Sequence, residues 1–240
     1  EGKLHLVLEQ KDAGYKKPFF DNGLNFLGGN WAKGKNDETS PAETVDREIR
    51  EEFWQAYEAP ESLNELLGQE FLEREPQVSA QYDQASVNRI QTMAALLRSG
   101  IEHAGDYIVT VRPPITNDAL VYGSSIFAKE LTADELHEVN TLVDQFGGKL
   151  TTDNLKWNSQ IAVATLDDIN LANTKFSWGY DHTINHLLDS GALPEQDSRI
   201  IRPMNLISVE PLDYNSEQER TETGSPTYRG FERLGFKYRE

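Results

Sequence analysis

The stretch GGNWAKGKNDETSPAETVDREIREEFW, residues 28–54, determines how the first part of the chain folds. Its second half predicts a helix that begins at Ser40, because Ser40 and Glu43 form an S-x-x-E capping box and Pro41 suits the first helical position. The helix is expected to end near Tyr57. Three apolar residues spaced by four form its predicted buried side: Val45, Ile49 and Phe53.

The same helix carries three carboxylates on one face. Glu48, Glu51 and Glu52 have the spacing i, i+3 and i+4, which brings side chains together on a helix. Like charges so close repel one another, and a divalent cation such as Mg²⁺ would relieve the repulsion with hard oxygen ligands. Arg47 adds a guanidinium that can hold one carboxylate in place. A solvated acidic surface is the alternative interpretation of this pattern.

Strands and helices alternate along the rest of the chain, which predicts an α/β fold with a mixed sheet. We expect one domain over residues 1–210, a helical insertion at about 61–103, and a polar tail over 211–240. A further strand is expected within 199–212. Strands are otherwise predicted at 4–10, 24–29, 106–113, 119–131 and 159–166, and helices at 133–146 and 178–191.

Composition narrows the classes of function. The formal charge of −17 repels nucleic-acid backbones, so no nucleic-acid partner is expected. No apolar run approaches the roughly 18 residues of a membrane span, so no membrane partner is expected. The absence of cysteine excludes disulfides and thiolate metal sites and fits a cytoplasmic protein.

The segment Arg47-Glu48-Ile49-Arg50-Glu51-Glu52 resembles the core of the Nudix hydrolase signature, G-x5-E-x7-R-E-U-x-E-E-x-G-U, in which U is a bulky aliphatic residue. The glycine pair Gly28-Gly29 resembles the turn that precedes the helix in that superfamily. FSWGYDHTINHLL, at 176–188, is similar to the segment that often closes its domains, so the resemblance covers roughly residues 4–190. The spacing from Gly29 to Arg47 is about four residues longer than usual, and Trp54 stands where the signature has glycine.

The resemblance implies a Nudix-like α/β/α sandwich with a mixed sheet and an additional helical insertion. It also implies hydrolysis of the pyrophosphate bond in a nucleoside diphosphate linked to another moiety, with Mg²⁺ or Mn²⁺ as cofactor. By the same resemblance, Arg47 would orient a carboxylate, and Gly28 and Gly29 would let the backbone approach metal and phosphate. The implied metal ligands and catalytic carboxylates are Glu48, Glu51 and Glu52.

The general base of many Nudix hydrolases lies on a separate loop. Glu130, Glu135 and Glu138 are the candidates in this chain, and Glu130 is favoured because it ends a predicted strand. Ordinary surface acids are the alternative interpretation of all three.

The loop GNWAKGKN, at 29–36, offers further substrate contacts. Lys33 and Lys35 would meet phosphates if the loop folds over the site, and Trp31 could stack on a nucleobase. The loop also resembles the phosphate-binding motif G-x-x-x-x-G-K-[ST], but Asn36 replaces the hydroxyl that would hold Mg²⁺.

Two other patterns have ordinary explanations. His182 and His186 have the spacing of zinc-binding helices, but Thr183 replaces the glutamate of the metalloprotease motif, so polar contacts are the favoured interpretation. Trp178 and Tyr180 could also stack on a base, although aromatic packing is the commoner role.

A second hypothesis is a Nudix-like nucleotide-binding or regulatory module that has lost catalysis. The longer glycine loop, Trp54 and the insertion at 61–103 motivate it. The helical stretch 61–103 could form a lid or a dimer surface. Its apolar segment IQTMAALL, at 90–97, offers a side to bury, and a homodimer is the favoured expectation.

Overall fold

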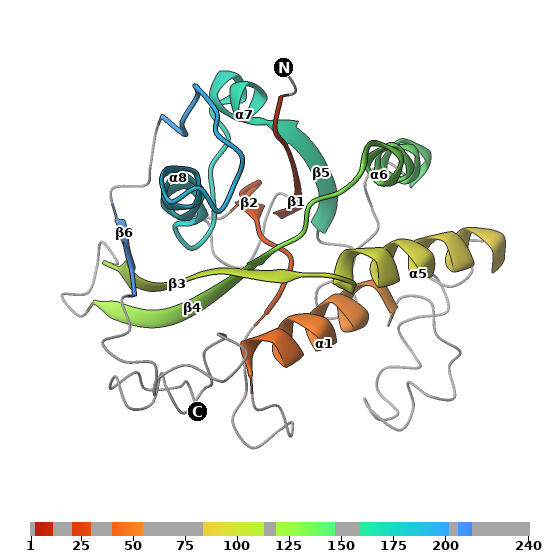
Figure 1. Cartoon of the computed structure of the whole chain (residues 1–240), viewed down its shortest axis with the longest axis horizontal. Coiled ribbons are helices and arrows are strands. Elements are labelled where there is room, and N and C mark those ends of the chain that lie inside the picture. Colours follow the sequence, from red (N-terminus) through yellow and green to blue (C-terminus); the bar gives the residue numbers. More distant parts are fainter. Residues whose placement is uncertain are drawn as a thin grey trace.

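The computed structural model describes residues 3–11, 21–29, 40–54, 84–112, 119–146, 159–201 and 206–212 (Figure 1). Within these ranges the chain forms two small antiparallel sheets and five helices. The elements, in chain order, are β1 (His5–Lys11), β2 (Leu24–Asn25), α1 (Pro41–Trp54), α5 (Gln84–Arg98), β3 (Glu102–Val111), β4 (Leu120–Ala128), α6 (Ala133–Phe146), β5 (Ser159–Thr165), α7 (Leu166–Ala172), α8 (Tyr180–Asp189) and β6 (Ile207–Pro211).

The first sheet has the order β2-β1-β5, and its strands are antiparallel. Side chains alternate between its two faces, as the pleat of a strand requires. Val7 packs with α1, α5 and α6, whereas Leu8 packs with α7 and α8 on the other face. This sheet therefore has helices on both faces.

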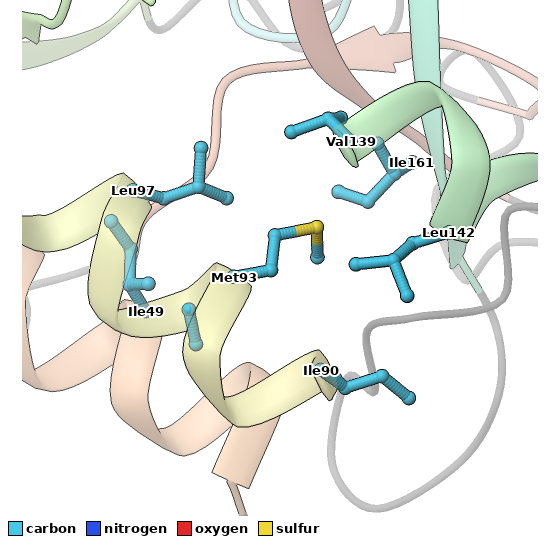
Figure 2. Close-up of a cluster of buried hydrophobic side chains, with 8 residues drawn as sticks. Ile49, Ile90, Met93, Leu97, Val139, Leu142 and Ile161 are labelled. Atoms are coloured by element: carbon cyan, nitrogen blue, oxygen red, sulfur yellow. The ribbon is translucent and has the colours of Figure 1, made fainter. Parts of the chain in front are cut away.

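The core that α1, α5 and α6 build against the first sheet is shown in Figure 2. Met93 of α5 points between residues of α6 and β5, and its flexible thioether suits an irregular gap. Figure 1 shows α1 and α5 running side by side. The buried members of this core are Ile49, Ile90, Met93, Ala94, Leu97, Val139, Leu142 and Ile161.

Helix α8 lies between the two sheets. Its residues Ile184 and Leu188 join the core of the first sheet, while Leu187 packs with the second sheet. The second sheet has the order β4-β3-β6 and is also antiparallel. Its long hairpin of β3 and β4 is visible in Figure 1. Gly179, at the N-terminus of α8, has a φ of +77° and lies where a Cβ would be 2.6 Å from Ile207.

The predicted α/β fold is confirmed, and the expected helix of residues 133–146 coincides with α6. The expected mixed sheet is wrong for the described residues, because both sheets are antiparallel. The one parallel contact in this part of the chain is an isolated bridge between Leu24 and Phe176.

The helical insertion predicted at 61–103 is wrong at its C-terminal end. Helix α5 ends at Arg98, Gly100 follows with a φ of +66°, and β3 already begins at Glu102. The N-terminal part of the predicted insertion, residues 61–83, lies outside the described ranges, as does the tail from 213 onward. Helix α7 was not expected, although Thr165 and Asp168 form a complete capping box at its start.

Candidate functional site

Helix α1 begins as its capping signals predict. The backbone N–H of Glu43 donates to Ser40 Oγ at 3.4 Å, and the backbone N–H of Ser40 donates to a Glu43 carboxylate oxygen at 3.3 Å. This reciprocal pair satisfies two N–H groups that the helix itself leaves without partners. The cap sets where the helix begins, and it thereby sets the direction of each side chain that follows.

The apolar side of α1 fixes its rotation. Ile49 is buried in the core shared with α5 and α6, and Val45 packs against the same core. Glu48 is the residue before Ile49, so its side chain projects from the edge of the buried side rather than from its centre. Its side chain is 18% exposed, which leaves the carboxylate partly accessible to solvent.

The Glu48 carboxylate lies against the backbone of Gly29. A Cβ built on Gly29 would overlap the carboxyl carbon and both oxygens of Glu48, so an alanine there would displace that group. Arg47 lies beside it, with an Nη2 to Oε1 distance of 2.8 Å. Gly29, Glu48 and Arg47 are thus brought together from two segments of the chain.

Gly28 has a different reason to be glycine. Its φ is +140°, a conformation that residues with a side chain rarely adopt, and a Cβ there would have no atom within 4 Å. Gly28 therefore supplies the turn, and Gly29 supplies the close approach to Glu48.

Several predicted residues lie outside the described ranges. These include Trp31, Lys33 and Lys35, and the same holds for the side chains of Glu51 and Glu52. The backbone of α1 places the last two on the same helical face as Glu48. Among the side chains that the structure describes, no three histidine, cysteine or acidic residues lie close enough to hold a metal ion.

The three candidate bases differ in their surroundings. Glu130 is exposed in the turn between β4 and α6. Glu135 accepts a hydrogen bond of 2.7 Å from the backbone N–H of Thr132, and this bond holds the pKa of Glu135 below its usual range. Glu138 accepts from Arg89 of α5 at 2.9 Å. Glu135 and Glu138 therefore act as a helix cap and a surface ion pair, and Glu130 alone of the three has neither role.

A polar row crosses the first sheet on the face that α1 covers, and the sequence did not indicate it. Lys11 Nζ donates to Glu9 Oε1 at 2.8 Å, and Asn25 Nδ2 donates to Glu9 Oε2 at 3.2 Å. The Lys11 and Glu9 side chains are only 8% and 1% exposed. The alternating pattern of β1 predicts that these residues share a face, but it does not show that the face is buried.

Ser177 extends this polar row by one position. Its backbone N–H donates to Leu24 O at 2.8 Å beside the bridge between Leu24 and Phe176, so alternation puts Ser177 on the same face as Asn25. Among the residues that the structure describes, neither Asn25 Oδ1 nor Ser177 Oγ has a hydrogen-bond partner, and both atoms are buried. Such groups usually mark the position of a bound water or ligand atom.

His186 and the aromatic residues near α8 have structural contacts, whereas His182 Nε2 is buried without a hydrogen-bond partner among the described residues. His186 Nε2 lies 3.0 Å from the carbonyl oxygen of Val209. Tyr180 stacks on Phe26 with ring centroids 4.2 Å apart, and Trp178 meets Tyr122 edge to face. These contacts favour packing over base stacking for Trp178 and Tyr180.

Comparison of the chain with models of known families, with characterised proteins and with solved structures found no match. None of the helices in the described ranges has the length and apolar character needed to cross a bilayer.

Proposed function

We propose that the chain is a Nudix-type pyrophosphohydrolase that cleaves a nucleoside diphosphate linked to another moiety. The substrate diphosphate would bind beside Gly29 and Glu48, with Mg²⁺ or Mn²⁺ as cofactor. Glu48, Glu51 and Glu52 would be the metal ligands. The protein would then be a hydrolase that acts on an acid anhydride.

The observation that carries this proposal is the contact between Gly29 and the Glu48 carboxylate. Two segments separated by eighteen residues meet at a point where only a hydrogen atom fits on the Cα of Gly29. A hard cation prefers carboxylate and backbone carbonyl oxygens, and this is the kind of donor set that such a contact brings together. The contact supports the proposal because it places one carboxylate of the implied ligand set against the backbone of the glycine turn.

Arg47 has a positioning role in this scheme. Its guanidinium is held 2.8 Å from Glu48, and both side chains are 18% exposed. An ion pair of this length restrains the orientation of the carboxylate. The carboxylate would then face the diphosphate with little reorganisation when substrate binds.

The reaction needs a water to attack phosphorus while the bond to the bridging oxygen breaks. When bound, Mg²⁺ or Mn²⁺ would offset the charge on the diphosphate oxygens and lower the pKa of a bound water. The carboxylates of α1 would hold the site in place, and Glu130 is the proposed acceptor of the proton from the attacking water. Its exposed position leaves it without a competing ion pair or cap among the described residues.

The test is a panel of pyrophosphate substrates assayed with Mg²⁺ and with Mn²⁺. We expect turnover of at least one nucleoside diphosphate derivative, and loss of that turnover in Glu52→Gln without a change in melting temperature. Asp144→Asn is the matched control, since Asp144 is an exposed carboxylate on α6. Full activity in Glu52→Gln would show that the carboxylates of α1 do not catalyse the reaction. Nucleotide binding without any turnover would instead favour a module that has lost catalysis.

A further inference from the structure

The polar row of the first sheet contains two buried atoms whose hydrogen bonds no described residue completes, namely Asn25 Oδ1 and Ser177 Oγ. Asn25 is 7% exposed and Ser177 is 1% exposed. A carbonyl oxygen and a hydroxyl buried in this way cost free energy unless a water or a ligand completes their hydrogen bonds. The two atoms therefore mark a place where a hydrogen-bonding group of another molecule can be held.

The neighbours of Asn25 determine which end of its amide is open. Asn25 Nδ2 donates to Glu9 Oε2 at 3.2 Å and to the carbonyl oxygen of Phe26 at 2.9 Å. An amide nitrogen has two N–H donors, so both are used here. An exchange of the amide oxygen and nitrogen would set the oxygen against two acceptors. Oδ1 is therefore the open end of the amide, and it can only accept a hydrogen bond.

Ser177 lies next to Asn25 across a parallel pairing. Leu24 and Phe176 form the bridge, so the residues that follow them lie side by side at the spacing of neighbouring strands, about 4.8 Å. A hydroxyl can donate or accept, whereas Asn25 Oδ1 only accepts. The pair thus matches a ligand edge on which an N–H donor stands beside an acceptor.

Charge favours a neutral ligand edge beside this row. The Lys11 ammonium and the Glu9 carboxylate are 2.8 Å apart and offset one another, and their side chains are 8% and 1% exposed. A phosphate brought against this pair would add a buried charge that the row does not offset. The edge of a heterocyclic base carries N–H donors and acceptors without net charge, so it suits the row better than a phosphate does.

The row lies on the same side of the sheet as the contact between Gly29 and Glu48. Leu27 packs with the core that α1 builds, whereas Phe26 packs with the core on the other face, so alternation puts Asn25 on the α1 side. Four residues of extended chain span at most about 14 Å, which is comparable with the length of a nucleotide from its phosphates to the edge of its base. Exposure rises along this path, from buried Asn25 through half-buried Leu27 to exposed Gly29.

We propose that Asn25 and Ser177 bind the nucleobase of the substrate by its hydrogen-bonding edge. An N–H of the base donates to Asn25 Oδ1, and the acceptor beside it accepts from the Ser177 hydroxyl. Adenine offers this edge as an amino group beside a ring nitrogen, and uracil offers it as a ring N–H beside a carbonyl. The inference rests on the proposed function for the nature of the ligand, since a nucleoside diphosphate brings such a base with it.

The experiment is a chemical-shift titration of the full chain with nucleoside monophosphates in the absence of metal, so that binding is measured without hydrolysis. Adenosine monophosphate is compared with purine ribonucleotide, which lacks the amino group, and uridine monophosphate with its analogue methylated at the ring N–H. We expect the adenine or the uracil nucleotide to shift the backbone amide signals of residues 9–11, 24–25 and 177. Its modified analogue should bind at least about tenfold more weakly. Ribose 5-phosphate, which has no base, should leave these signals unchanged.

Ser177→Ala should weaken binding of the preferred nucleotide by about tenfold, because the base then loses a buried donor. Thr183→Val is the matched control, since the buried Thr183 hydroxyl already donates to the carbonyl oxygen of Gly179 at 3.2 Å, and it should leave binding unchanged. The modified analogues test the same contact without any substitution. Equal binding of an analogue and its parent, no shift of these signals by either nucleotide, or unaltered binding in Ser177→Ala would overturn the proposal and assign the two atoms to buried water.

Failure of the base site and failure of the proposed function give different results. Hydrolysis of a pyrophosphate substrate without discrimination at the edge of the base would reject the base site and retain the hydrolase. Discrimination between the monophosphates without hydrolysis of any pyrophosphate substrate would retain the base site and reject the hydrolase.

Discussion

Replacement of Gly29 by alanine is the sharpest perturbation of the proposed hydrolytic site. The new methyl group would occupy the space of the Glu48 carboxylate, which must therefore move by roughly 1 Å or more to reach van der Waals contact. The backbone of Gly29 does not have the positive φ that would strain an alanine. The substitution thus moves one functional group and leaves the turn intact.

The expected effects on stability and on catalysis differ in size. Glu48 can retreat because its side chain is flexible and partly exposed, and a strained rotamer costs about 0.5–1.5 kcal/mol. Alanine also reduces the conformational entropy of the unfolded chain, which stabilises the folded state by about 0.4–1 kcal/mol. The net change in the free energy of unfolding is therefore within about 1 kcal/mol. A displacement of about 1 Å in a catalytic site can reduce turnover by about 100-fold, or about 2.7 kcal/mol of activation free energy.

The assay is pyrophosphate hydrolysis with Mn²⁺, measured beside thermal unfolding. Gly28→Ala is the matched control: it meets no neighbouring atom but must adopt a φ of +140°, so it should cost about 1–3 kcal/mol of stability without moving Glu48. We expect Gly29→Ala to lose activity at nearly constant melting temperature and Gly28→Ala to show the reverse pattern. If Gly29→Ala keeps full turnover, the Glu48 carboxylate does not act where we place it.

Three further predictions concern stability. Lys11→Met should lower the free energy of unfolding by about 3–5 kcal/mol, since it leaves the buried Glu9 carboxylate without its cation, and chemical denaturation measures this loss. Gly179→Ala should lower the free energy of unfolding by about 2–4 kcal/mol, because the alanine must adopt a φ of +77° and its Cβ would press against two side chains of β6. An unchanged melting temperature would contradict this packing. Hydrogen bonds from the side chain and backbone of Thr165 lower the pKa of the Asp168 carboxyl from its ordinary value of 3.8. The stability that these bonds confer is therefore fully present above the pKa of the unfolded chain. It is lost as the pH falls through the lower pKa of the folded protein. Asp168→Asn should therefore reduce the acid dependence of unfolding in a pH series, and an identical profile would contradict this.

Local signals predicted local structure well. The capping pairs at Ser40 and Thr132 set the starts of α1 and α6, because cap and helix are neighbours in sequence. Helix α7 carries the same kind of signal at Thr165, but the predicted strand at 159–166 includes Thr165, so the capping box was not recognised as a helix start.

Features that depend on contacts between distant segments could not be predicted in this way. The alternation of β1 puts Glu9 and Lys11 on one face, but it shows neither that this face is buried nor the register that brings Asn25 opposite Glu9. The bulge of β3 depends on pairing with β4, so it left no recognisable pattern. The family resemblance implied that the Gly28-Gly29 backbone approaches metal and phosphate, but the contact between Gly29 and Glu48 was not predicted.

The central claim is that the carboxylates of α1 hold a divalent cation that in turn binds a diphosphate. Calorimetric titration of Mn²⁺ tests it most directly, with and without a methylene-bridged nucleoside diphosphate that cannot be hydrolysed. We predict that the analogue tightens Mn²⁺ binding and that Glu48→Gln weakens it by at least about tenfold, while Asp144→Asn leaves it unchanged. Absence of Mn²⁺ uptake even with the analogue present, or equal uptake in Glu48→Gln, would contradict the claim.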